Sequence, residues 1–446
     1  MGQTASALTT AKILREHYLP GIEAEFNTKT ILRDRLRKTK VVPVSGRYYL
    51  YNLWATENQA VGSRAEGGTL PVASQQGYNS ALFYRTNQYG RFNISGVAID
   101  AAARGGAGSL DPLDQEMKGL RRTMSKDNNR QLFGDGSGLL ARCSSATDNG
   151  STWTITVDTS SRMPAANQYI RAGMTVAIQK LSDGTIFASS AAATVSSVTA
   201  TTVTIADPGG TATNVNSDYA LYRRDASAGV WTSTAGSGTT TDSYGLLSAF
   251  GATEPGWFWW TAAVAVYGTG TSGQYGDIAK ASNGYWQGNV LSGSANTTTH
   301  VGPGTLRPLT LDLMQQAVDA SEFYEGEISL ILCDQAMWRK YAALMYPDRR
   351  WAGNVKTLDG GWKSLMFNDI PVVKDVDCPP NTFFFIDEST LDILQERTLS
   401  EMAEDDIILL RDSNTDSYTG TLIYREQLGC NAPNKNAILT DIHPTL

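Results

Sequence analysis

The sequence is poor in the residues that most often carry out chemistry. Among its 446 residues are four cysteines and three histidines, and only 18% of the residues are charged. Cys143, Cys333, Cys378 and Cys430 lie far apart and form no C-x-x-C pair, which argues against a zinc site and a disulfide framework. No metalloprotease motif, nucleophile elbow, phosphate-binding loop or dinucleotide fingerprint occurs. The sequence therefore predicts no catalytic, metal-binding or cofactor-binding residue.

Long apolar runs are also missing. No stretch approaches the roughly 18 apolar residues that a membrane span needs. The first ten residues have neither the basic end nor the apolar core of a secretory signal. Residues 1–6 fit the loose myristoylation pattern, which we interpret as coincidence. We therefore expect no membrane partner and a reducing, cytoplasmic place of folding.

Charge is unevenly distributed along the chain. Residues 1–130 hold 18 basic and 11 acidic residues, a net charge of +7, whereas the rest of the chain has a net charge of −14. This asymmetry indicates two surfaces with different neighbours. Six basic residues fall within twelve positions, accompanied by one acid, Asp34; they are Lys29, Arg33, Arg35, Arg37, Lys38 and Lys40.

A long polar excursion follows this basic segment. Residues 41–44 and 47–54 have the β-branched and aromatic content of a strand, and residues 78–100 form a second strand by the same criterion. Between them, residues 55–77 carry four glycines and no regular apolar period, which is typical of a loop. A lone hairpin buries too little surface to be stable. We therefore expect this one to lie on a neighbouring copy of the chain.

The next segment predicts one uninterrupted helix from Asp111 to Phe133. Asp111 can cap its N-terminus, Pro112 suits the first helical position, and Gly134 can end it. Its opposite face is polar and largely basic. A packing helix of any α/β domain would give the same pattern. The apolar stripe, at spacings of four, three and four, consists of Leu113, Met117, Leu120 and Met124.

The remainder of the chain consists of three segments that differ in composition and pattern. Residues 143–225 predict at least four short antiparallel strands, in the pattern of a small sandwich or barrel. Residues 226–304 are rich in tryptophan and tyrosine, which favours a buried or protein-contacting role over sugar stacking. From Thr310 onward, helices capped by Thr310 and Asp334 alternate with apolar strands, and further strands close the chain.

The order of these elements resembles the tailed-phage major capsid protein of the Hong Kong 97-type shell fold. Two local stretches strengthen the resemblance. Residues 367–373 and 384–387 are similar to a stretch that these proteins carry late in the chain, and residues 424–438 are similar to their closing strand. The ordered set covers most of the chain except the β-rich segment.

The resemblance implies an α+β fold in which the β-rich segment is an added module. Late strands 407–426 would join the peripheral domain. The implied parts are an N-terminal arm (1–44), an extended loop (45–104), a spine helix and peripheral domain (105–140), an inserted β domain (141–235), an axial α/β domain (236–406), and late peripheral strands with the closing axial strand (407–446).

It also implies a function: a virion subunit, assembled in the host cytoplasm, whose hexamers and pentamers form an icosahedral head around double-stranded DNA. The basic arm would face the lumen and meet phosphates without sequence readout. Portal and scaffolding proteins are expected partners. Because the chain reaches the arm at once, we expect either a separate scaffolding protein or none. The residues expected to make inter-subunit contacts are Tyr49, Tyr51, Trp54, Arg64, Glu66, Tyr84 and Arg85.

One feature departs from some members of that family. They join subunits through an isopeptide bond from a lysine of the extended loop, but no lysine occurs here between Lys40 and Lys118. The contacts are therefore expected to be non-covalent. Three alternatives stay open: an encapsulin-type compartment, a carbohydrate-binding tail or fibre protein based on the aromatic segment, and, with least support, an enzyme.

Overall fold

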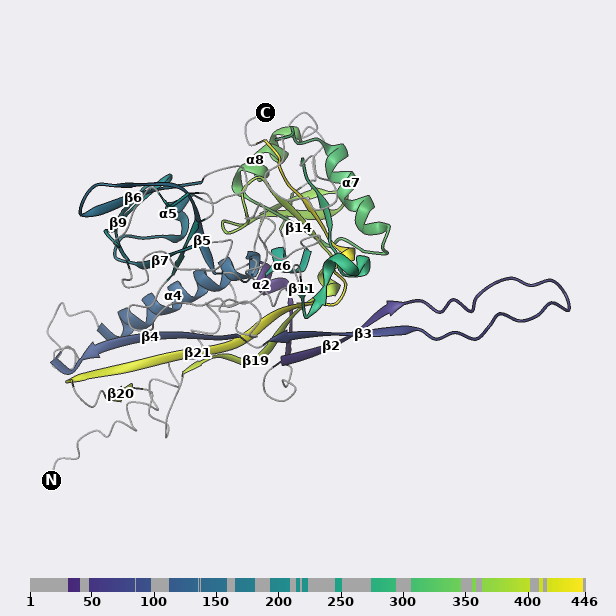
Figure 1. The fold of residues 1–446 in the computed structure, drawn as a ribbon, viewed down its shortest axis with the longest axis horizontal. Helices are drawn as coiled ribbons and strands as arrows, with labels where there is room; N and C mark the ends of the chain where they lie inside the picture. Colours follow the sequence, from purple (N-terminus) through teal and green to yellow (C-terminus); the bar gives the residue numbers. More distant parts are fainter. Residues whose placement is uncertain are drawn as a thin grey trace, which may run out of the picture.

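Strands dominate the structure, a computed structural model, and they form two main sheets, a barrel and a projecting hairpin (Figure 1). No helix in the described part of the chain is both long and apolar enough to cross a membrane. The described residues are 31–40, 48–84, 86–97, 112–134, 136, 138–158, 165–180, 193–208, 214–216, 219–223, 245–250, 274–293, 306–345, 355–357, 363–401, 409–411 and 415–443.

A mixed seven-stranded sheet forms the upper part of the body (Figure 1). The pairs β13–β22 and β14–β17 are parallel and the others are antiparallel. In spatial order the strands are β13 (Asn289–Leu291), β22 (Ala437–Leu439), β18 (Phe383–Ile386), β14 (Leu330–Cys333), β17 (Ile370–Lys374), β16 (Lys363–Phe367) and β15 (Val355–Thr357).

Both faces of this sheet are buried, which explains why its central strand is apolar at every position. Alternate side chains of β14 point to opposite faces. Leu330 and Leu332 pack into the main core, whereas Ile331 and Cys333 pack under helices α7 (Leu311–Glu322) and α8 (Gln335–Leu344). As predicted, Thr310 Oγ1 accepts from Leu313 N at 3.1 Å to cap α7, and Asp334 caps α8.

A second sheet of five strands lies below, where β21 pairs with β19 and β20 along one edge and with β4 along the other. β1 joins by parallel pairing with β19. Its strands are β1 (Arg37–Lys40), β4 (Thr86–Ser95), β19 (Leu391–Glu401), β20 (Leu409–Arg411) and β21 (Ser417–Cys430).

The long helix α4 (Pro112–Phe133) packs on this second sheet and confirms the predicted helix (Figure 1). Met117 and Met124 are buried and Leu120 is half-buried, as the stripe predicted. A side chain at Gly90 of β4 would meet the sulfur of Met124 at 2.5 Å, so a glycine lets helix and strand approach closely. Asp111 and the side chain of Leu113 lie outside the described residues.

Three sequence-based assignments need correction. The sequence of residues 28–40 predicts a short helix, but residues 37–40 form a strand. The predicted strand 78–100 is two strands, β3 (Gly77–Tyr84) and β4, which belong to different sheets. Residues 391–401, where no strand was predicted, form β19, which pairs antiparallel with β21 from Leu391↔Cys430 to Glu401↔Leu422.

The β-rich segment forms a closed antiparallel barrel of six strands, in agreement with the predicted small β unit. Its apolar core is separate from the two cores of the body. The short helix α5 (Ala166–Tyr169) packs Ala166 into that core. In order around the barrel the strands are β10 (Tyr219–Arg223), β5 (Leu139–Asp148), β6 (Thr152–Val157), β9 (Thr202–Ala206), β8 (Ala193–Val198) and β7 (Thr175–Lys180).

Several short elements complete the described structure. Helix α6 (Leu246–Phe250) is wholly buried in the main core. The remaining elements are two short strands, four single 3-10 turns and one short helix. They are β11 (Gln274–Tyr275), β12 (Ile278–Ala279), η3 (Lys280–Ser282), η4 (Gly284–Trp286), η6 (Glu388–Thr390), η7 (Pro433–Lys435) and the helix α2 (Ile31–Arg35).

Gly245→Ala should destabilise the fold. Its added carbon would lie 2.3 Å from the carbonyl oxygen of Gln131 and 2.6 Å from those of Leu132 and Gly134, at the end of α4. Backbone atoms cannot rotate away, so we expect a loss of about 1–3 kcal/mol in denaturant unfolding. The control is Gly119→Ala on the exposed face of α4, where nothing lies within 4 Å. It should stabilise by about 0.5–1 kcal/mol. Equal effects of the two changes would contradict the close packing at Gly245.

Candidate inter-subunit hairpin and its buried anchor

The hairpin formed by β2 (Tyr48–Thr56) and β3 is the most unusual feature of the molecule. The two strands pair antiparallel from Tyr48↔Tyr84 to Thr56↔Gly77. The loop 57–76 then continues far beyond the body (Figure 1). The hairpin therefore has a base within the body and a long free tip.

Aromatic rings hold the base. Phe83 is buried and makes edge-to-face contacts with Tyr51 at 5.9 Å and Tyr275 at 5.0 Å between ring centroids. Tyr275 in turn packs on Trp286 at 5.6 Å. Such pairs add about 0.5–1.5 kcal/mol each beyond the burial of their area. The base is therefore part of the main hydrophobic core.

Hydrogen bonds fix the direction of the base. Tyr51 Oη donates to Asp392 Oδ2 at 2.6 Å, and Asn79 Nδ2 donates to Tyr285 Oη at 3.0 Å. The backbone N–H of Leu82 donates to the carbonyl of Gly276 at 2.9 Å. The bonds join the hairpin to β19, η4 and the β11–β12 turn, so the hairpin leaves the body in a set orientation.

The aromatic side chains of residues 226–304 that the structure describes therefore pack in or against the main core. Tyr275 and Trp286 are completely buried, and Tyr285 is half-buried against the hairpin. This agrees with the buried role that the sequence favoured over sugar stacking. Trp231, Tyr244, Trp257, Trp259 and Trp260 lie outside the described residues.

The tip of the hairpin exposes apolar side chains to solvent. Val61, Leu70 and Val72 are each more than 80% exposed, and Trp54 and Tyr78 are 59% and 73% exposed. On a projecting loop these side chains are not covered by their own chain, and contiguous exposed apolar surface marks sites of association. The tip is therefore the strongest candidate contact surface in the described chain.

The seven residues expected to make inter-subunit contacts differ in how far the structure exposes them. Tyr49 is fully buried in its own subunit and Tyr51 bonds to Asp392, so neither is available to a neighbour, because β2 is rooted more deeply than a loop would be. Trp54, Arg64 and Glu66 are exposed on the projecting part. Arg64 Nε donates to Thr69 O at 3.0 Å and braces the tip. Arg85 and the side chain of Tyr84 lie outside the described residues.

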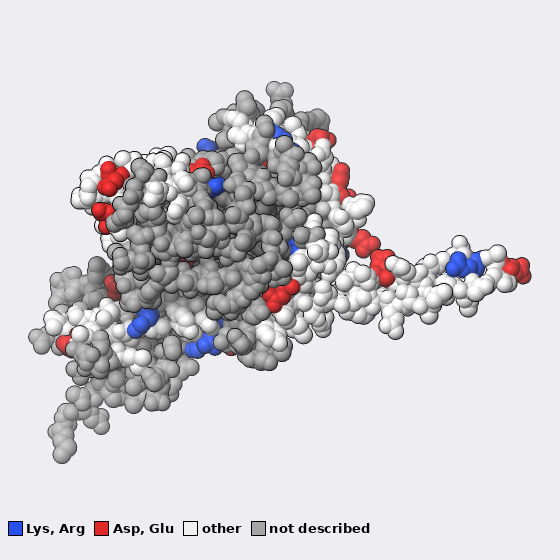
Figure 2. Space-filling model, viewed as in Figure 1, with Lys and Arg blue, Asp and Glu red and all other residues white. Residues whose placement is uncertain are grey.

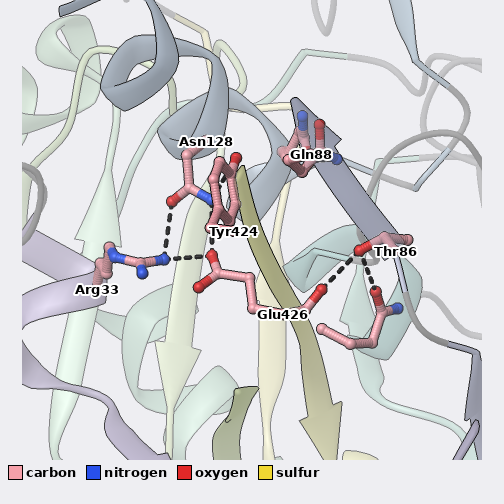
Figure 3. A network of polar contacts seen from close by, with 8 residues as sticks. Arg33, Thr86, Gln88, Asn128, Tyr424 and Glu426 are labelled. Atoms are coloured by element: carbon pink, nitrogen blue, oxygen red, sulfur yellow. Dashed lines mark hydrogen bonds and ion pairs between the residues drawn. The ribbon is translucent and has the colours of Figure 1, made fainter. Parts of the chain in front are cut away.

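Beside the hairpin, a buried ion pair joins three distant segments (Figure 3). The guanidinium of Arg33, from α2, pairs with the carboxylate of Glu426 on β21. Arg33 Nη1 also donates to Asn128 Oδ1 of α4 at 3.1 Å. Asn128 Nδ2 donates to Glu426 Oε1 at 2.7 Å and to Tyr424 Oη at 3.2 Å. We call these four residues the anchor.

The anchor extends to the strand that follows the hairpin. Thr86 Oγ1, at the start of β4, donates to the carbonyl of Glu426 at 2.6 Å (Figure 3). Nearby, Gln88 Nε2 donates to Gln131 Oε1 of α4 at 2.8 Å. The N-terminal helix, the long helix and the two strands therefore meet at one polar centre inside the fold.

The anchor corrects one expectation and limits another. Arg33 was expected to face DNA, but its side chain is 1% exposed because it compensates the buried charge of Glu426. Arg35 makes two bonds to Glu388, at 2.6 and 2.7 Å, and is half-buried. Arg37, Lys38 and Lys40 lie on β1, but the structure does not describe their side chains. Lys29 lies outside the described residues. Nothing in the sequence identified Glu426 as the partner of Arg33, since 393 positions separate them.

The described residues offer little reactive chemistry. They contain no group of three or more metal-ligating side chains. All four cysteines are buried. Burial raises the pKa of the Cys143 and Cys430 thiols to about 12, and it raises the pKa of Cys333 and Cys378 well above the ordinary value.

Comparison with known proteins identifies the fold. No protein-family profile matches the sequence, and no curated protein matches it. Among solved structures, the chain is similar to the capsid asymmetric unit of cyanophage A-1(L), with 15% identity over 94% of this chain and 92% of that one, at a TM-score of 0.51. It is also similar to the encapsulin of a holo-SrpI complex from Synechococcus elongatus (9% identity, 94% and 90% covered, TM-score 0.43) and to the capsid of a native GTA particle (9%, 93% and 94%, 0.41).

These matches span nearly the whole length of both chains. The cyanophage subunit has the highest TM-score of the three, and at 15% identity it establishes the fold alone. The protein therefore has the fold of a phage major capsid protein, as the order of elements in the sequence suggested. Neither contacts nor contents of a shell follow from this similarity.

Removing one member of the anchor should be costly. Arg33→Met leaves the carboxylate of Glu426 buried without its cationic partner, and breaking a buried pair costs about 3–5 kcal/mol. The double variant Arg33→Met/Glu426→Met should recover most of that loss in denaturant unfolding. Arg35→Met is the control and should cost less than about 1 kcal/mol, because its pair with Glu388 is partly exposed. A double variant as unstable as the sum of the singles would show that the pair does not interact.

The thiols should be unreactive while the protein is folded. A pKa of about 12 leaves very little thiolate at about pH 8, and the thiolate is the reactive form. A colorimetric thiol reagent should therefore label no cysteine in native protein at that pH and four after unfolding. Rapid labelling of native protein would show that at least one thiol is accessible.

Proposed function

We propose that this protein is the major subunit of an icosahedral phage head, in which hexamers and pentamers enclose double-stranded DNA. The observation that carries the proposal is the hairpin: its base is buried in the subunit, and its tip projects into solvent with Val61, Leu70 and Val72 exposed. An isolated hairpin of this kind gains too little from burial to be ordered. A neighbouring subunit would supply the missing surface.

The same contact would protect strand edges. A projecting two-stranded ribbon presents unpaired backbone groups on both sides, which is a risk for aggregation. When the tip lies on the next subunit, those edges and the apolar side chains are covered together. Each subunit would then both give one hairpin and receive another, so the contact would propagate through a closed shell.

The contacts would be non-covalent. No lysine occurs from residue 41 to residue 117, so the hairpin cannot supply the amine of an isopeptide bond. The stability of the shell must then come from buried area at the subunit contacts. A shell of this kind should dissociate in denaturant to single chains.

The exposed face of α4 is the better candidate for the lumen. Lys118, Arg122 and Lys126 are exposed along it. On the face shown, acidic side chains follow the border beside α7 (Figure 2). Phosphate contacts of this kind carry no sequence information. With Arg33 and Arg35 engaged elsewhere, these three residues and the basic residues of β1 would meet the DNA.

The tip of the hairpin should be required for assembly and not for folding. In the variant Val61→Ser/Leu70→Ser/Val72→Ser, all changes lie on exposed positions, so unfolding should be unchanged. Negative-stain microscopy and sedimentation should show shells, rings or hexameric sheets for the natural chain and small species for the variant. The matched control is Val61→Ile/Leu70→Met/Val72→Ile, which keeps the apolar tip and should assemble. Normal shells from the serine variant would contradict the proposed contact.

The contents of the shell are a separate question with its own measurement. Shells purified after infection or co-expression should contain nucleic acid, and Lys118→Gln/Arg122→Gln/Lys126→Gln should weaken DNA binding with a shallower salt dependence. Shells that hold a protein cargo and no nucleic acid would favour an encapsulin-type compartment instead.

A further inference from the structure

The barrel contacts the body through a small cluster of polar side chains. Its apolar core includes no residue of the body. Instead, Gln168 Nε2 of α5 donates to the carbonyl of Val376 at 2.7 Å, and the Tyr169 hydroxyl bonds to the carboxylate of Asp377. Both partners lie in the loop that follows β17, so α5 packs its apolar side into the barrel and its polar end against the body.

Two carboxylates meet at this cluster. A single amide nitrogen, Asn129 Nδ2 of α4, donates to Asp375 Oδ1 at 2.9 Å and to Asp377 Oδ2 at 2.7 Å. Asp375 is buried and Asp377 is half-buried. Two oxygens bonded to the same nitrogen lie close to one another, so the carboxyl groups repel strongly when both are ionised.

The surroundings neutralise that charge only in part. Arg130 of α4 is the cation that faces Asp377, but its Nε is bound to Asp127 on the same helix at 3.2 Å. The other titratable groups at the cluster are Tyr169 from α5 and Cys378 next to Asp377. Burial, reinforced by Asp377, raises the pKa of Tyr169 well above its ordinary value, so it stays a neutral donor.

We propose that Asp375 and Asp377 form a proton-operated latch that holds the barrel against the body when a proton is shared between them and loosens the barrel when both are ionised. Asn129 and Tyr169 are positioning residues of this latch. It joins three elements that are far apart in sequence: α4, α5 and the loop after β17. The latch is a property of the single subunit, so its test needs no assembled shell.

The direction of the pH dependence follows from the carboxyl groups. Burial and the charge of Asp375 raise the pKa of Asp377 from 3.8 to about 6, and burial raises the pKa of Asp375. The closed state therefore binds protons more tightly than an open, hydrated state does. Docking of the barrel should be tightest below about pH 4, and the advantage should be lost as the pH rises through about 6, so docking is tighter at about pH 5 than at about pH 7.5.

Hydrogen–deuterium exchange of the full chain can measure the latch. The amides of residues 165–172 belong to the segment whose side chains contact the body, and those of α7 serve as a reference in the same molecule, which cancels the intrinsic pH dependence of exchange. In the natural chain, protection of α5 relative to α7 should fall of the order of tenfold between about pH 5 and about pH 7.5.

The variant Asp377→Asn imitates the protonated carboxyl and should keep α5 protected at both pH values. Glu322→Gln removes an equivalent charge from an exposed position on α7 and should behave as the natural chain does. Tyr169→Phe, which removes the donor, should lower protection already at about pH 5. Should Asp377→Asn fail to fold, Asp375→Asn provides the same comparison.

The outcome that overturns the latch is equally clear. Constant relative protection of α5 in the natural chain across this pH range would exclude it. So would an equal loss of protection in the natural chain and in Asp377→Asn, because the loss would then arise from another group.

Discussion

The orientation of the hairpin depends on the burial of its base in the core of its own subunit. A two-stranded ribbon on its own is too flexible to keep one direction in water. Here Phe83 is enclosed by Tyr51 and Tyr275, and the polar bonds to Asp392 and Tyr285 prevent rotation. In the proposed shell, the free tip would be aimed before a neighbour is met, which would lower the entropy that ordering otherwise costs on assembly.

The anchor extends the same principle to the rest of the lower sheet. A buried ion pair adds little net stability compared with apolar packing, but it penalises every arrangement in which its members are separated. Arg33, Asn128 and Glu426 come from α2, α4 and β21, so their meeting specifies how these elements cross. The neighbouring bond from Thr86 ties the strand after the hairpin to the same point. Core and hairpin are thus held in register by polar specificity added to apolar burial.

The sequence predicted the elements whose signals are local. The long helix, the caps at Thr310 and Asp334 and the strands of the barrel follow from period, capping and turn residues, and the structure confirms them. Contacts between distant positions were not accessible in the same way. Arg33 carries the same sequence signal whether it faces solvent or Glu426, and Tyr49 fits an exposed strand as well as a buried one. β19 was missed because its charged residues hide a strand that β21 makes stable.

The chain leaves the body and returns to it at nearly the same place. Leu139 and Tyr222 are paired across β5 and β10, so the first and last strands of the barrel lie side by side. Gly245 then packs directly on Gly134, where the long helix ends. With both ends adjacent and a core of its own, the barrel has the geometry of a cassette. A short turn could replace it, or a different domain with neighbouring ends could be spliced in, while the surrounding framework keeps its connections.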